Sequence, residues 1–536
     1  MEYDAIVIGA GHNGLVAANY LARKGMKVGV FERRSVVGGC CTTEAPFSKA
    51  RDFMVNAGAI DHILIHGTSI IRDLELEKYG LKYVRLEPMF EVPFEEGRNV
   101  VFYSDLKKTV GVFEQFSKRD AQRYETLVRE WLREEELLRS LMLDAPPRIS
   151  ELFGVNIRSL GRFLSRSSLL GAIPAATHVD FDSMIRTVVV PANQLLKEEF
   201  EDEHIRVALS ALFSLIFSTM SPSLPSSGLM VIMHTMLYKT GLHRPVGGSG
   251  MLPLALVKAL ESLGGSVFTN SEVRRIVVKG MSVMGVELSS GEFIGARVVV
   301  SNVDAKRTLT KLVEPDLISS ELKRKLENLR ITSYGMTFHA ALNSLPKMNK
   351  DAALLQAGKL IVPDTIEAIE SAYYIANSTH RLSPIPLLAV NFPTTYDPSL
   401  APLDRHVLYS WAQFVPDNSP MIWEEGYSEF REDAEAKIKR RLFERWPDLE
   451  RMIVDTFTET PGDLEQRLWI QRGNTQHIDP TLDQLYYYRP TPELSQYKSP
   501  IKGLYLTGAA THPGGGISGM PGHNTAKVIL RDVANI

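Results

Sequence analysis

Three glycines and one glutamate near the N-terminus have the spacing of a nucleotide-binding site. Gly9, Gly11 and Gly14 follow a G-x-G-x-x-G pattern, and Glu32 comes 18 residues after Gly14. In this pattern the first glycine permits a tight turn, the second lets the backbone approach a pyrophosphate, and the third lets a helix pack closely on a strand. A carboxylate about 20 residues further along binds the ribose hydroxyls. These residues therefore predict a site for the ADP part of a dinucleotide.

The flanking residues supply the elements that such a site needs. Residues 5–8 and 28–31 are short apolar runs typical of buried parallel strands, and residues 15–24 have the composition of a helix. His12 and Asn13 fall in the turn before this helix, whose free N–H groups favour phosphate binding. A glycine turn without a ligand is the alternative, but the strand, helix, second strand and terminal acid all agree with a dinucleotide.

The residues after the second strand bear on which dinucleotide binds. Glu32 disfavours a 2′-phosphate on the ribose, because like charges repel, whereas Arg33 and Arg34 could bind one. The fingerprint alone therefore leaves FAD and NAD(P) open.

A second glycine-rich segment lies near the C-terminus. Residues 504–507 form a predicted strand that leads into Gly508, and a helix is predicted from about His523 to Ala534. Glycines at this density let the backbone approach a large flat ligand, and the start of the helix offers its dipole to a negative group. A glycine-rich surface loop is the alternative, which the closely spaced strand and helix disfavour. The residues predicted to contact the ligand here are Gly508, Gly516, Gly519, Met520 and Pro521.

The middle of the chain adds a helix and a small sheet. Residues 244–251 open a predicted helix that continues through residue 263. The predicted strands that follow are residues 266–269, 273–278, 285–288 and 298–301.

Other catalytic patterns are weak. His62 and His66 lie at i and i+4 and could face one metal ion, but a di-iron site needs several more such pairs, and none has matching spacing. The sequence contains no nucleophile elbow and no P-loop. Cys40 and Cys41 are adjacent rather than separated as C-x-x-C, which favours packing near a ligand over a redox pair. We predict no metal site.

Composition narrows the class of protein. The 536 residues are 44% apolar and 23% charged, with a net charge of −3, which gives no general attraction to nucleic acid. Two cysteines cannot form a disulfide framework, so we expect a reducing compartment and a cytoplasmic location. The N-terminus lacks the pattern of a signal peptide. Ile205–Met220 comes nearest to a spanning helix, but it is short and contains Arg206, so a buried helix is the first interpretation and a membrane-dipping helix the second.

Over essentially its whole length, the chain resembles the phytoene-desaturase-like superfamily of FAD-dependent oxidoreductases. The segments that carry the resemblance are GAGHNG at 9–14, ERRSVVGG at 32–39, RPVGGSG at 244–250, VVSN at 299–302, residues 473–490 and LYLTGAATHPGGGISGMPG at 504–522. The resemblance implies FAD as the cofactor, with Gly38 and Gly39 along the pyrophosphate and ribityl chain and the backbone of Val273 over the adenine. Many flavoproteins have an acidic residue after the glycine at Gly508, where this chain has Ala509. The desaturase group often lacks that acid.

Within the superfamily, the chain looks closest to the desaturase-like β-carotene ketolases. Residues 59–62 and 74–81, the GMPGHN segment and the LDQ…RP run resemble that group. The same motifs occur a little less closely in animal pyridine-nucleotide-disulfide-oxidoreductase-domain proteins. The implied activity is ketolation or desaturation of a carotenoid or related polyene. The alternatives are oxidation of another isoprenoid lipid or quinone, and a flavin-binding partner protein with little turnover.

The resemblance also implies an α/β architecture in which a Rossmann-type FAD-binding domain, like that of glutathione reductase and amine oxidases, is interleaved with a substrate domain of mixed sheet plus helices. The predicted FAD-binding domain comprises residues 1–85, 235–310 and 495–536, and the predicted substrate domain comprises residues 86–234 and 311–494.

Two helical segments of the predicted substrate domain differ in character. Residues 121–143 have a helical period, and their charged residues, including those at 129–136, are predicted to form a solvated face. In residues 153–170, Arg158, Arg162 and Arg166 fall on one helix face beside apolar residues. This pattern fits a helix lying in a headgroup layer, or an amphipathic helix packed on the core. Because a carotenoid resides in lipid, we expect peripheral membrane association.

Flavin chemistry requires few protein side chains, because the cofactor itself accepts the hydride. The protein should supply a long apolar tunnel, for which residues 205–220 and 229–237 are candidates alongside an ordinary core role. Polar candidates near the flavin are His477, Asp479, Asp483, Arg489 and His512. Our hypothesis is that His477, Asp479 or His512 transfers a proton, on the ground of their place in the resembling segments.

Overall fold

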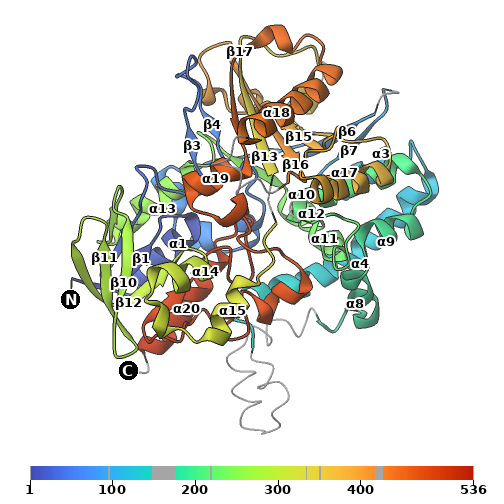
Figure 1. Ribbon diagram of the computed structural model, residues 1–536. Coiled ribbons are helices and arrows are strands. Elements are labelled where there is room, and N and C mark those ends of the chain that lie inside the picture. Colours follow the sequence, from blue (N-terminus) through green and yellow to red (C-terminus); the bar gives the residue numbers. More distant parts are fainter. Residues whose placement is uncertain are drawn as a thin grey trace.

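The computed structural model describes residues 2–94, 97–147, 176–217, 220–332, 335–348, 352–416 and 426–534. Two seven-stranded sheets organise these residues (Figure 1). The sheet that holds the N-terminal strand lies to the left in Figure 1, and the second sheet lies at the upper right with a group of helices beside it. Residues 153–170, for which the sequence predicts an amphipathic helix, lie outside the described residues.

The first sheet has a parallel centre and an antiparallel extension. Its strands are β1 (Tyr3–Ile8), β2 (Val28–Phe31), β9 (Ser266–Phe268), β10 (Val273–Lys279), β11 (Ser282–Leu288), β12 (Phe293–Ser301) and β18 (Leu504–Leu506). The order is β10-β11-β12-β1-β2-β9, and β18 also pairs with β12. β12 pairs antiparallel with β11 through its first residues and parallel with β1 and β18 through its last. This one long strand therefore joins the small sheet to the nucleotide-binding sheet.

Both faces of the parallel strands are buried, as their continuous apolar sequences require. Three helices cover one face: α1 (His12–Ala22), α13 (Met251–Ser262) and α20 (Met520–Val533). The other face packs on α14 (Ala305–Arg307), the following π-helical turn (Thr308–Leu312) and α15 (Ser320–Glu327). A Cβ on Gly522 would collide with the backbone oxygen of Asn13, so this glycine allows α20 to lie directly against α1.

The second sheet is antiparallel except where β14 runs parallel to β6. In the order of the sheet its strands are β17 (Ile453–Glu459), β13 (Gly335–Leu342), β16 (His406–Gln413), β15 (Leu388–Asn391), β14 (Gly358–Ile361), β6 (Phe90–Pro93) and β7 (Asn99–Phe102). One face packs against α18 (Gly426–Arg445) through Phe338, Val390 and Ile438, among others. The other face is turned toward the interior of the molecule.

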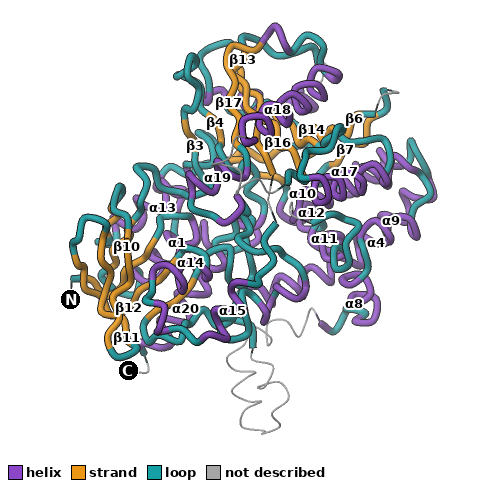
Figure 2. The backbone as a smooth tube through the Cα atoms, in the orientation of Figure 1, coloured by secondary structure: helices purple, strands orange, loops and turns teal. Residues whose placement is uncertain are grey.

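A helical layer lies beside the second sheet, as the tube in Figure 2 shows. It contains α3 (Leu106–Phe113), α4 (Lys118–Met142), α8 (Phe181–Val189), α9 (Ala192–Glu199), α10 (Glu203–Phe217), α11 (Gly228–Met233) and α12 (Met236–Thr240). The helices α16 (Ala352–Gln356), α17 (Ile366–Thr379) and α19 (Pro461–Leu468) belong to the later part of the chain, and α2 (Ile70–Asp73) to the earlier part. The largest apolar core joins this layer to β6 and β7.

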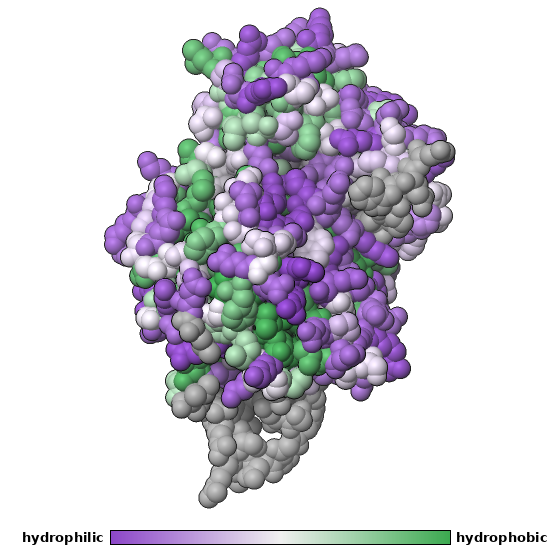
Figure 3. Space-filling view, turned by 60° about the vertical axis from the view of Figure 1, so that its left-hand side comes forward, coloured by the Kyte–Doolittle hydropathy of each residue, from purple (hydrophilic) through white to green (hydrophobic). Residues whose placement is uncertain are grey.

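Two of the segments that connect the sheets pair with each other as a short two-stranded ribbon. β5 (Tyr83–Leu86) on the way out pairs antiparallel with β8 (Leu242–Pro245) on the way back. A second two-stranded ribbon is formed by β3 (Thr43–Glu44) and β4 (Val55–Asn56). On the face shown in Figure 3, hydrophilic side chains predominate and hydrophobic ones gather in separate patches.

The predicted fold class is confirmed: a Rossmann-type sheet is interleaved with a second region of mixed sheet and helices. Two local predictions differ from the structure. The helix after the C-terminal loop begins at Met520, three residues earlier than predicted, because Pro521 is compatible with the first turn of a helix. The prediction of a wholly solvated charged face at residues 129–136 is wrong for Glu134 and Glu135, which are buried. Glu135 is bound by Arg139 and Lys239, which explains how it can be buried.

Candidate functional site

A cavity of about 600 Å³ extends from the N-terminal fingerprint to the second sheet. The predicted site residues that line it are Gly9, Gly11, His12, Asn13, Glu32, Arg33, Gly38, Gly39, Val273, His477, Gly508, His512 and Gly516. The predicted residues that lie outside its wall are Gly14, Asp479, Gly519, Met520 and Pro521. Residues far apart in the sequence are therefore brought to one place.

The fingerprint turn is shaped by close backbone approaches. A Cβ on Gly14 would lie 2.5 Å from the carbonyl oxygen of Gly9, so only glycine lets α1 begin this close to β1. A Cβ on Gly11 would lie 2.6 Å from Nδ2 of Asn302. Gly38 donates its N–H to the carbonyl of Ala10 at 2.8 Å, which joins the second glycine pair to the fingerprint.

Glu32 lies at the end of β2 with both carboxylate oxygens engaged. Oε2 accepts from the N–H of Ala10 at 2.9 Å, and Oε1 accepts from the N–H of Arg34 at 2.9 Å. The arginines that could have bound a 2′-phosphate already have protein partners. Arg34 pairs with Glu44 at 2.7 Å, and Arg33 donates to the carbonyls of residues 466 and 467 at 3.0 and 2.6 Å. This geometry favours a ribose with a free 2′-hydroxyl.

The cysteines after Gly39 both line the cavity as free thiols. Burial raises the pKa of Cys40 to about 11 and raises the pKa of Cys41 further. Sγ of Cys41 lies 3.6 Å from Nδ1 of His12. Because both thiols remain protonated at neutral pH, they are poor nucleophiles and act here as small packing residues.

The C-terminal loop reaches the cavity through its glycines. Gly508 and Gly516 have φ values of +92° and +103°, which side chains rarely adopt. A Cβ on Gly516 would also lie 2.7 Å from Cδ1 of Leu64 on the opposite side. Gly519, in contrast, caps α20, and Met520 is the buried first residue of that helix. The predicted contact set therefore divides into loop residues at the cavity and helix residues behind it.

Arg489 connects this loop to the preceding segment. Its side chain is fully buried, and its guanidinium donates to carbonyls: those of Ala509 at 2.7 Å, Gln476 at 2.7 Å, and Ile478 and Gln484 at 3.2 Å. Burial lowers the pKa of Arg489 to about 9, so it remains charged at neutral pH. The sequence placed Arg489 among the polar candidates near the flavin, and the structure gives it a positioning role.

Comparison with known proteins agrees with this geometry. Residues 14–343 match the family described as flavin containing amine oxidoreductase. The chain belongs to this family. Membership implies a flavin cofactor for the cavity described above. The solved structure of an oxidoreductase from Methanosarcina mazei has the same fold, with a TM-score of 0.60, 17% identity, and coverage of 98% of this chain and 99% of that one.

Three curated relatives are similar over nearly the whole chain. The pyridine nucleotide-disulfide oxidoreductase domain-containing protein 2 of Rattus norvegicus is 31% identical, covering 100% of this chain and 94% of the relative. A limonene dehydrogenase component of Castellaniella defragrans is 27% identical, covering 99% and 95%. Phytoene desaturase (lycopene-forming) of Pseudescherichia vulneris is 26% identical, covering 98% and 99%. The resemblance to the phytoene-desaturase-like superfamily is thus supported, and the ketolase assignment stays a prediction.

The polar atoms around the cavity fit a flavin nucleotide of this family. Among the described residues, Nε2 of His12, Oδ1 of Asn302 and Oδ2 of Asp304 are buried without a hydrogen-bond partner, and all three residues line the cavity. Buried polar atoms are normally paired, so such a group of unpaired atoms indicates a ligand. Together with the glycine turns and Glu32, they provide the donors and acceptors that a nucleotide needs.

His477 and His512 are buried, neutral imidazoles at the cavity. Burial lowers the pKa of His477 to about 3 and the pKa of His512 to about 4. Nε2 of His512 lies 3.1 Å from the carbonyl oxygen of Leu141, so Nε2 carries the proton and Nδ1 is an acceptor. Nδ1 of both histidines is buried without a partner among the described residues. Both side chains therefore have a ring nitrogen free for a ligand, and the lowered pKa makes each imidazole a weak base at neutral pH.

Asp479 has a different environment from the two histidines. Its Oδ1 accepts from N and Oγ1 of Thr332 at 2.9 and 3.1 Å and from Nδ2 of Asn474 at 2.9 Å. The carboxylate thus holds the loop before η10 (Leu482–Gln484) against residues 330–332, outside the cavity wall. This position fits a structural anchor better than the predicted proton transfer. Asp483, the remaining candidate, forms an exposed pair with Arg330.

The far part of the cavity is lined by apolar side chains. The predicted tunnel segments contribute Leu212, Leu215, Leu229, Met233, Met236 and Leu237. Further wall residues that the sequence did not reveal come from α4 and the second sheet and include the polar side chain of Asn391: Phe90, Leu138, Leu141, Met142, Leu360, Ala389, Asn391, Tyr409 and Trp411. Alternating strand residues of this kind look like ordinary core positions in a sequence.

Trp469 is another site residue that the sequence did not reveal. It lines the cavity, and the guanidinium of Arg307 lies 5.2 Å from its ring centroid. Its helix, α19, follows the second sheet, and nothing in its local sequence pointed to a nucleotide.

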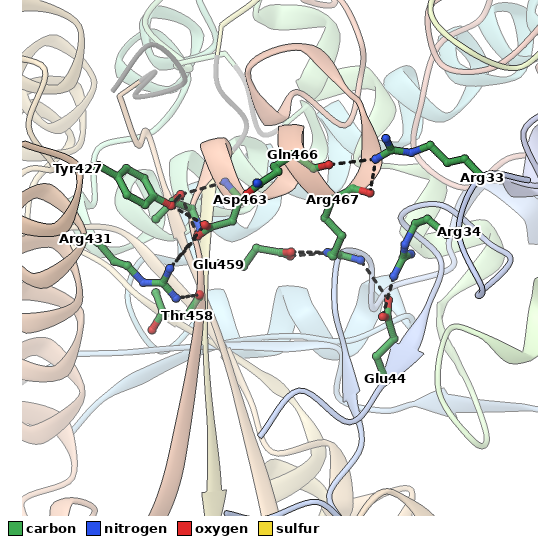
Figure 4. A network of polar contacts seen from close by, with 11 residues as sticks. Arg33, Arg34, Glu44, Tyr427, Arg431, Thr458, Glu459, Asp463, Gln466 and Arg467 are labelled. Carbon is green, nitrogen blue, oxygen red and sulfur yellow. Dashed lines mark hydrogen bonds and ion pairs between the residues drawn. The ribbon is translucent and has the colours of Figure 1, made fainter. Parts of the chain in front are cut away.

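A network of ion pairs fastens α19 to β17 of the second sheet and to the β3–β4 ribbon (Figure 4). Arg467 donates to Glu44 at 3.0 Å and to Glu459 at 2.8 Å, and Glu44 also binds Arg34. Behind it, Asp463 at the start of α19 accepts from the N–H of Thr460 at 2.9 Å in a capping box. The helix is thereby held beside the residues that follow Glu32.

Of the two histidines considered as metal ligands, His62 has partners at both ring nitrogens, whereas Nε2 of His66 has no hydrogen-bond partner among the described residues. His62 lies 3.0 Å from the hydroxyl of Tyr83 and 3.1 Å from that of Ser249, and His66 stacks on His243. The described part of the chain contains no cluster of three or more metal-ligating side chains. Within the same residues, no helix is both long and apolar enough to cross a membrane.

Proposed function

We propose that the protein is an FAD-dependent oxidoreductase that acts on a carotenoid or related polyene, by desaturation or by ketolation at an allylic ring carbon. The observation that carries the proposal is the continuity of the cavity. One part is lined by the fingerprint and the C-terminal glycine loop, and the other part by apolar side chains from α4, α10, α11 and the second sheet. Such a cavity can hold a flavin nucleotide and a long apolar molecule side by side.

The roles of the side chains follow from their places. In the proposal, residues 1–85, 235–310 and 495–536 hold FAD, which accepts a hydride when bound. Glu32 binds the ribose hydroxyls, and Asn302 binds the cofactor beside Gly11. The apolar wall excludes water from the reacting carbon. His512, whose Nδ1 is an unpaired acceptor, and His477 are the candidates to accept the proton that accompanies hydride removal.

Membrane association is part of the proposal, because the substrate is a lipid. Phe181, Ile185 and Val189 form a stripe on α8, and their side chains are 47%, 57% and 49% exposed. Val188 on the same helix lines the cavity. We infer that α8 lies in the lipid interface and that the cavity receives its substrate there. Sedimentation with anionic vesicles should be lost in Ile185→Glu and retained in Ser183→Glu, a change on the same helix.

The relatives support an isoprenoid substrate without choosing one. Two of the three are named for a limonene and a phytoene activity. Oxidation of another isoprenoid or a quinone is therefore the second candidate. A flavin-binding partner protein with little turnover is the third.

The test has two parts. The purified protein should show a flavin spectrum, at once or after addition of FAD, and FAD rather than FMN should be released on denaturation. The protein should then be expressed in hosts that accumulate different carotenoids, and the pigments analysed. New keto products indicate ketolation, and extended conjugation without oxygen indicates desaturation. A flavin-loaded protein that changes no polyene would contradict the polyene assignment.

A further inference from the structure

A row of polar side chains crosses the interior face of the second sheet. His339 on β13 is directly opposite Tyr409 on β16, and Tyr409 is directly opposite Asn391 on β15. Directly opposed residues on neighbouring strands project to the same face. Tyr409 and Asn391 line the cavity, and the His339 and Tyr409 rings are 5.3 Å apart. The apolar part of the cavity therefore has a polar strip in its wall.

His339 and Asn391 both have buried side-chain atoms without a hydrogen-bond partner among the described residues, and of the two only Asn391 lines the cavity. Its side chain is only 4% exposed, and its Oδ1 is buried with no hydrogen bond to any described residue. The backbone of Gly358 and the ring of Phe90 confine the amide on one side. A Cβ placed on Gly358 would lie 3.2 Å from Oδ1 of Asn391 and 2.9 Å from Cδ1 of Phe90. An amide enclosed in this way lacks a partner from the protein and needs one from the cavity.

Beside Tyr409, which is directly opposite, Asn391 has apolar neighbours in the cavity wall. Phe90, Leu360 and Ala389 line the same region of the cavity. An apolar residue at position 391 would complete this wall with no polar atom left unpaired. A polyene hydrocarbon would offer the amide nothing, and binding it would leave the amide desolvated and unpaired.

The row is electrically neutral, which limits the ligand. Burial, with a smaller contribution from the nearby charge of Arg467, lowers the pKa of His339 to about 3, so this imidazole is uncharged. Arg467 is itself bound by Glu459 and Glu44. Lys359, which is directly opposite Val390, also lines the cavity, but its ammonium is paired with Glu91 at 3.0 Å and supplies no free counter-ion. A charged ligand group would be buried here without a counter-ion.

Among neutral oxygen groups, a hydroxyl suits Asn391 best. A carboxamide has both a donor and an acceptor, and a hydroxyl both donates and accepts. A keto group accepts only, which would leave Oδ1 of Asn391 unpaired. We propose that Asn391 is a specificity-determining residue that binds a hydroxyl group, so that the substrate class is a hydroxylated isoprenoid rather than a pure hydrocarbon. This inference rests on the proposed function and assigns a substrate class to the same site.

The test measures discrimination between two probes that differ only in the hydroxyl. The probes are radiolabelled geranylgeraniol and the hydrocarbon with a methyl group in place of its CH2OH group, and binding is measured as retention on the flavin-loaded protein. The ratio of the two dissociation constants removes differences in general hydrophobic binding. We expect Asn391→Leu to shift this ratio by about ten-fold toward the hydrocarbon, the size expected for one buried hydrogen bond. Asn391→Ala should shift it in the same direction, and serves if the leucine variant does not fold.

Ser410→Ala is the matched control. Ser410 is equally buried, and its Oγ also lacks a partner among the described residues, but it lies next to Tyr409 on the opposite face of β16. Its removal should leave the ratio unchanged. An unchanged ratio in the Asn391 variants, as expected if only an ordered water occupies the amide, would overturn this inference alone. Retention of neither probe by flavin-loaded protein would overturn the isoprenoid function, and this inference with it.

Discussion

Nη2 of Arg489 donates to the carbonyl oxygen of Ala509 at 2.7 Å and thereby joins the two loops that line the cavity. The first loop carries His477, and the second carries His512 and Gly516. Within the described part of the chain, this guanidinium donates its hydrogen bonds to carbonyl oxygens of these loops rather than to a carboxylate. The planar group acts as a template on which the two segments are arranged.

Arg489→Lys should therefore lower stability by about 3 kcal/mol and reduce flavin content. A lysine keeps the charge but lacks the fixed array of five donors, so several carbonyls lose their partner inside the protein. The measurements are the thermal midpoint and the ratio of flavin to protein after purification. Arg330→Lys is the control, because the Arg330 side chain is 55% exposed in its pair with Asp483. If Arg489→Lys had the same thermal midpoint and flavin content as Arg330→Lys, the hydrogen bonds of the Arg489 guanidinium would not be needed to hold the two loops.

Glu32→Gln should weaken FAD binding by about ten- to hundred-fold. The glutamine can accept one of the two backbone bonds, from Ala10 or Arg34, but it loses the charge that strengthens the bonds to ribose hydroxyls. Reconstitution of the flavin-free protein, followed by fluorescence, gives the dissociation constant. Glu287→Gln on β11, whose carboxylate binds Arg275 away from the cavity, should leave it unchanged. Equal affinities for FAD in the two variants would argue against a ribose contact.

The fingerprint shows what local sequence can predict. The distance from Gly9 to Glu32 requires a strand, a turn, a helix and a second strand in fixed order, and the structure has these elements with boundaries shifted by a few residues. The C-terminal loop is similar, because Gly508 and Gly516 sit at φ values that other residues avoid. These features depend on neighbouring residues alone, so a single sequence reveals them.

The substrate side was less predictable for a physical reason. Asn391, Tyr409 and Trp469 reach the cavity because strands and helices distant in sequence pack together, and no local spacing marks them. Asp479 is the converse case. Its place in a motif led us to predict a chemical role, and its hydrogen bonds to Thr332 and Asn474 fit a structural one.

This difference between Asp479 and the histidines gives a prediction about turnover. All the bonds that Asp479 accepts from Thr332 and Asn474 end on one oxygen, which an asparagine can reproduce, so Asp479→Asn should retain flavin and turnover. If His512 accepts the proton, His512→Ala should lower turnover about hundred-fold at equal flavin content. The rates should be compared on flavin-loaded protein with whichever polyene is converted. Full activity of His512→Ala and His477→Ala would remove both residues from the mechanism.

The network of ion pairs around α19 predicts a non-additive effect of two substitutions on stability. Arg467→Met leaves Glu459, which is almost fully buried, without its partner, and should cost about 3 kcal/mol. Adding Glu459→Gln should recover part of that loss, because no uncompensated charge remains. Thermal midpoints of both single variants and the double variant test this, and the rate of flavin release should follow the same order. A double variant less stable than Arg467→Met would contradict the explanation.

The buried histidines predict that acid destabilises the protein over a defined pH range. Burial lowers the pKa to about 3 or 4 in His12, His62, His66, His234, His339, His477 and His512, from an ordinary value of 6.5. Above pH 6.5 these groups are neutral in the folded and unfolded states, so they do not lower the free energy of unfolding. Between pH 6.5 and about 4 the unfolded chain binds protons that the folded chain does not, so stability falls. Four buried carboxyls whose pKa is raised by burial act in the opposite sense and are fewer than the seven histidines: Glu134, Asp304, Glu459 and Asp479.

His339→Phe isolates one of these groups. His339 is fully buried against Tyr409 and Phe457 with neither ring nitrogen bonded to a described residue, so a phenyl ring should fit and should raise the thermal midpoint at pH 7. Below pH 6.5 the free energy of unfolding should fall less steeply than in the parent, by about 1.4 kcal/mol per pH unit for one missing protonation. Urea unfolding at intervals between pH 7 and 4 measures this, with exposed His380→Gln as the control. Parallel curves for the parent and His339→Phe would mean that this imidazole is not held neutral in the folded protein.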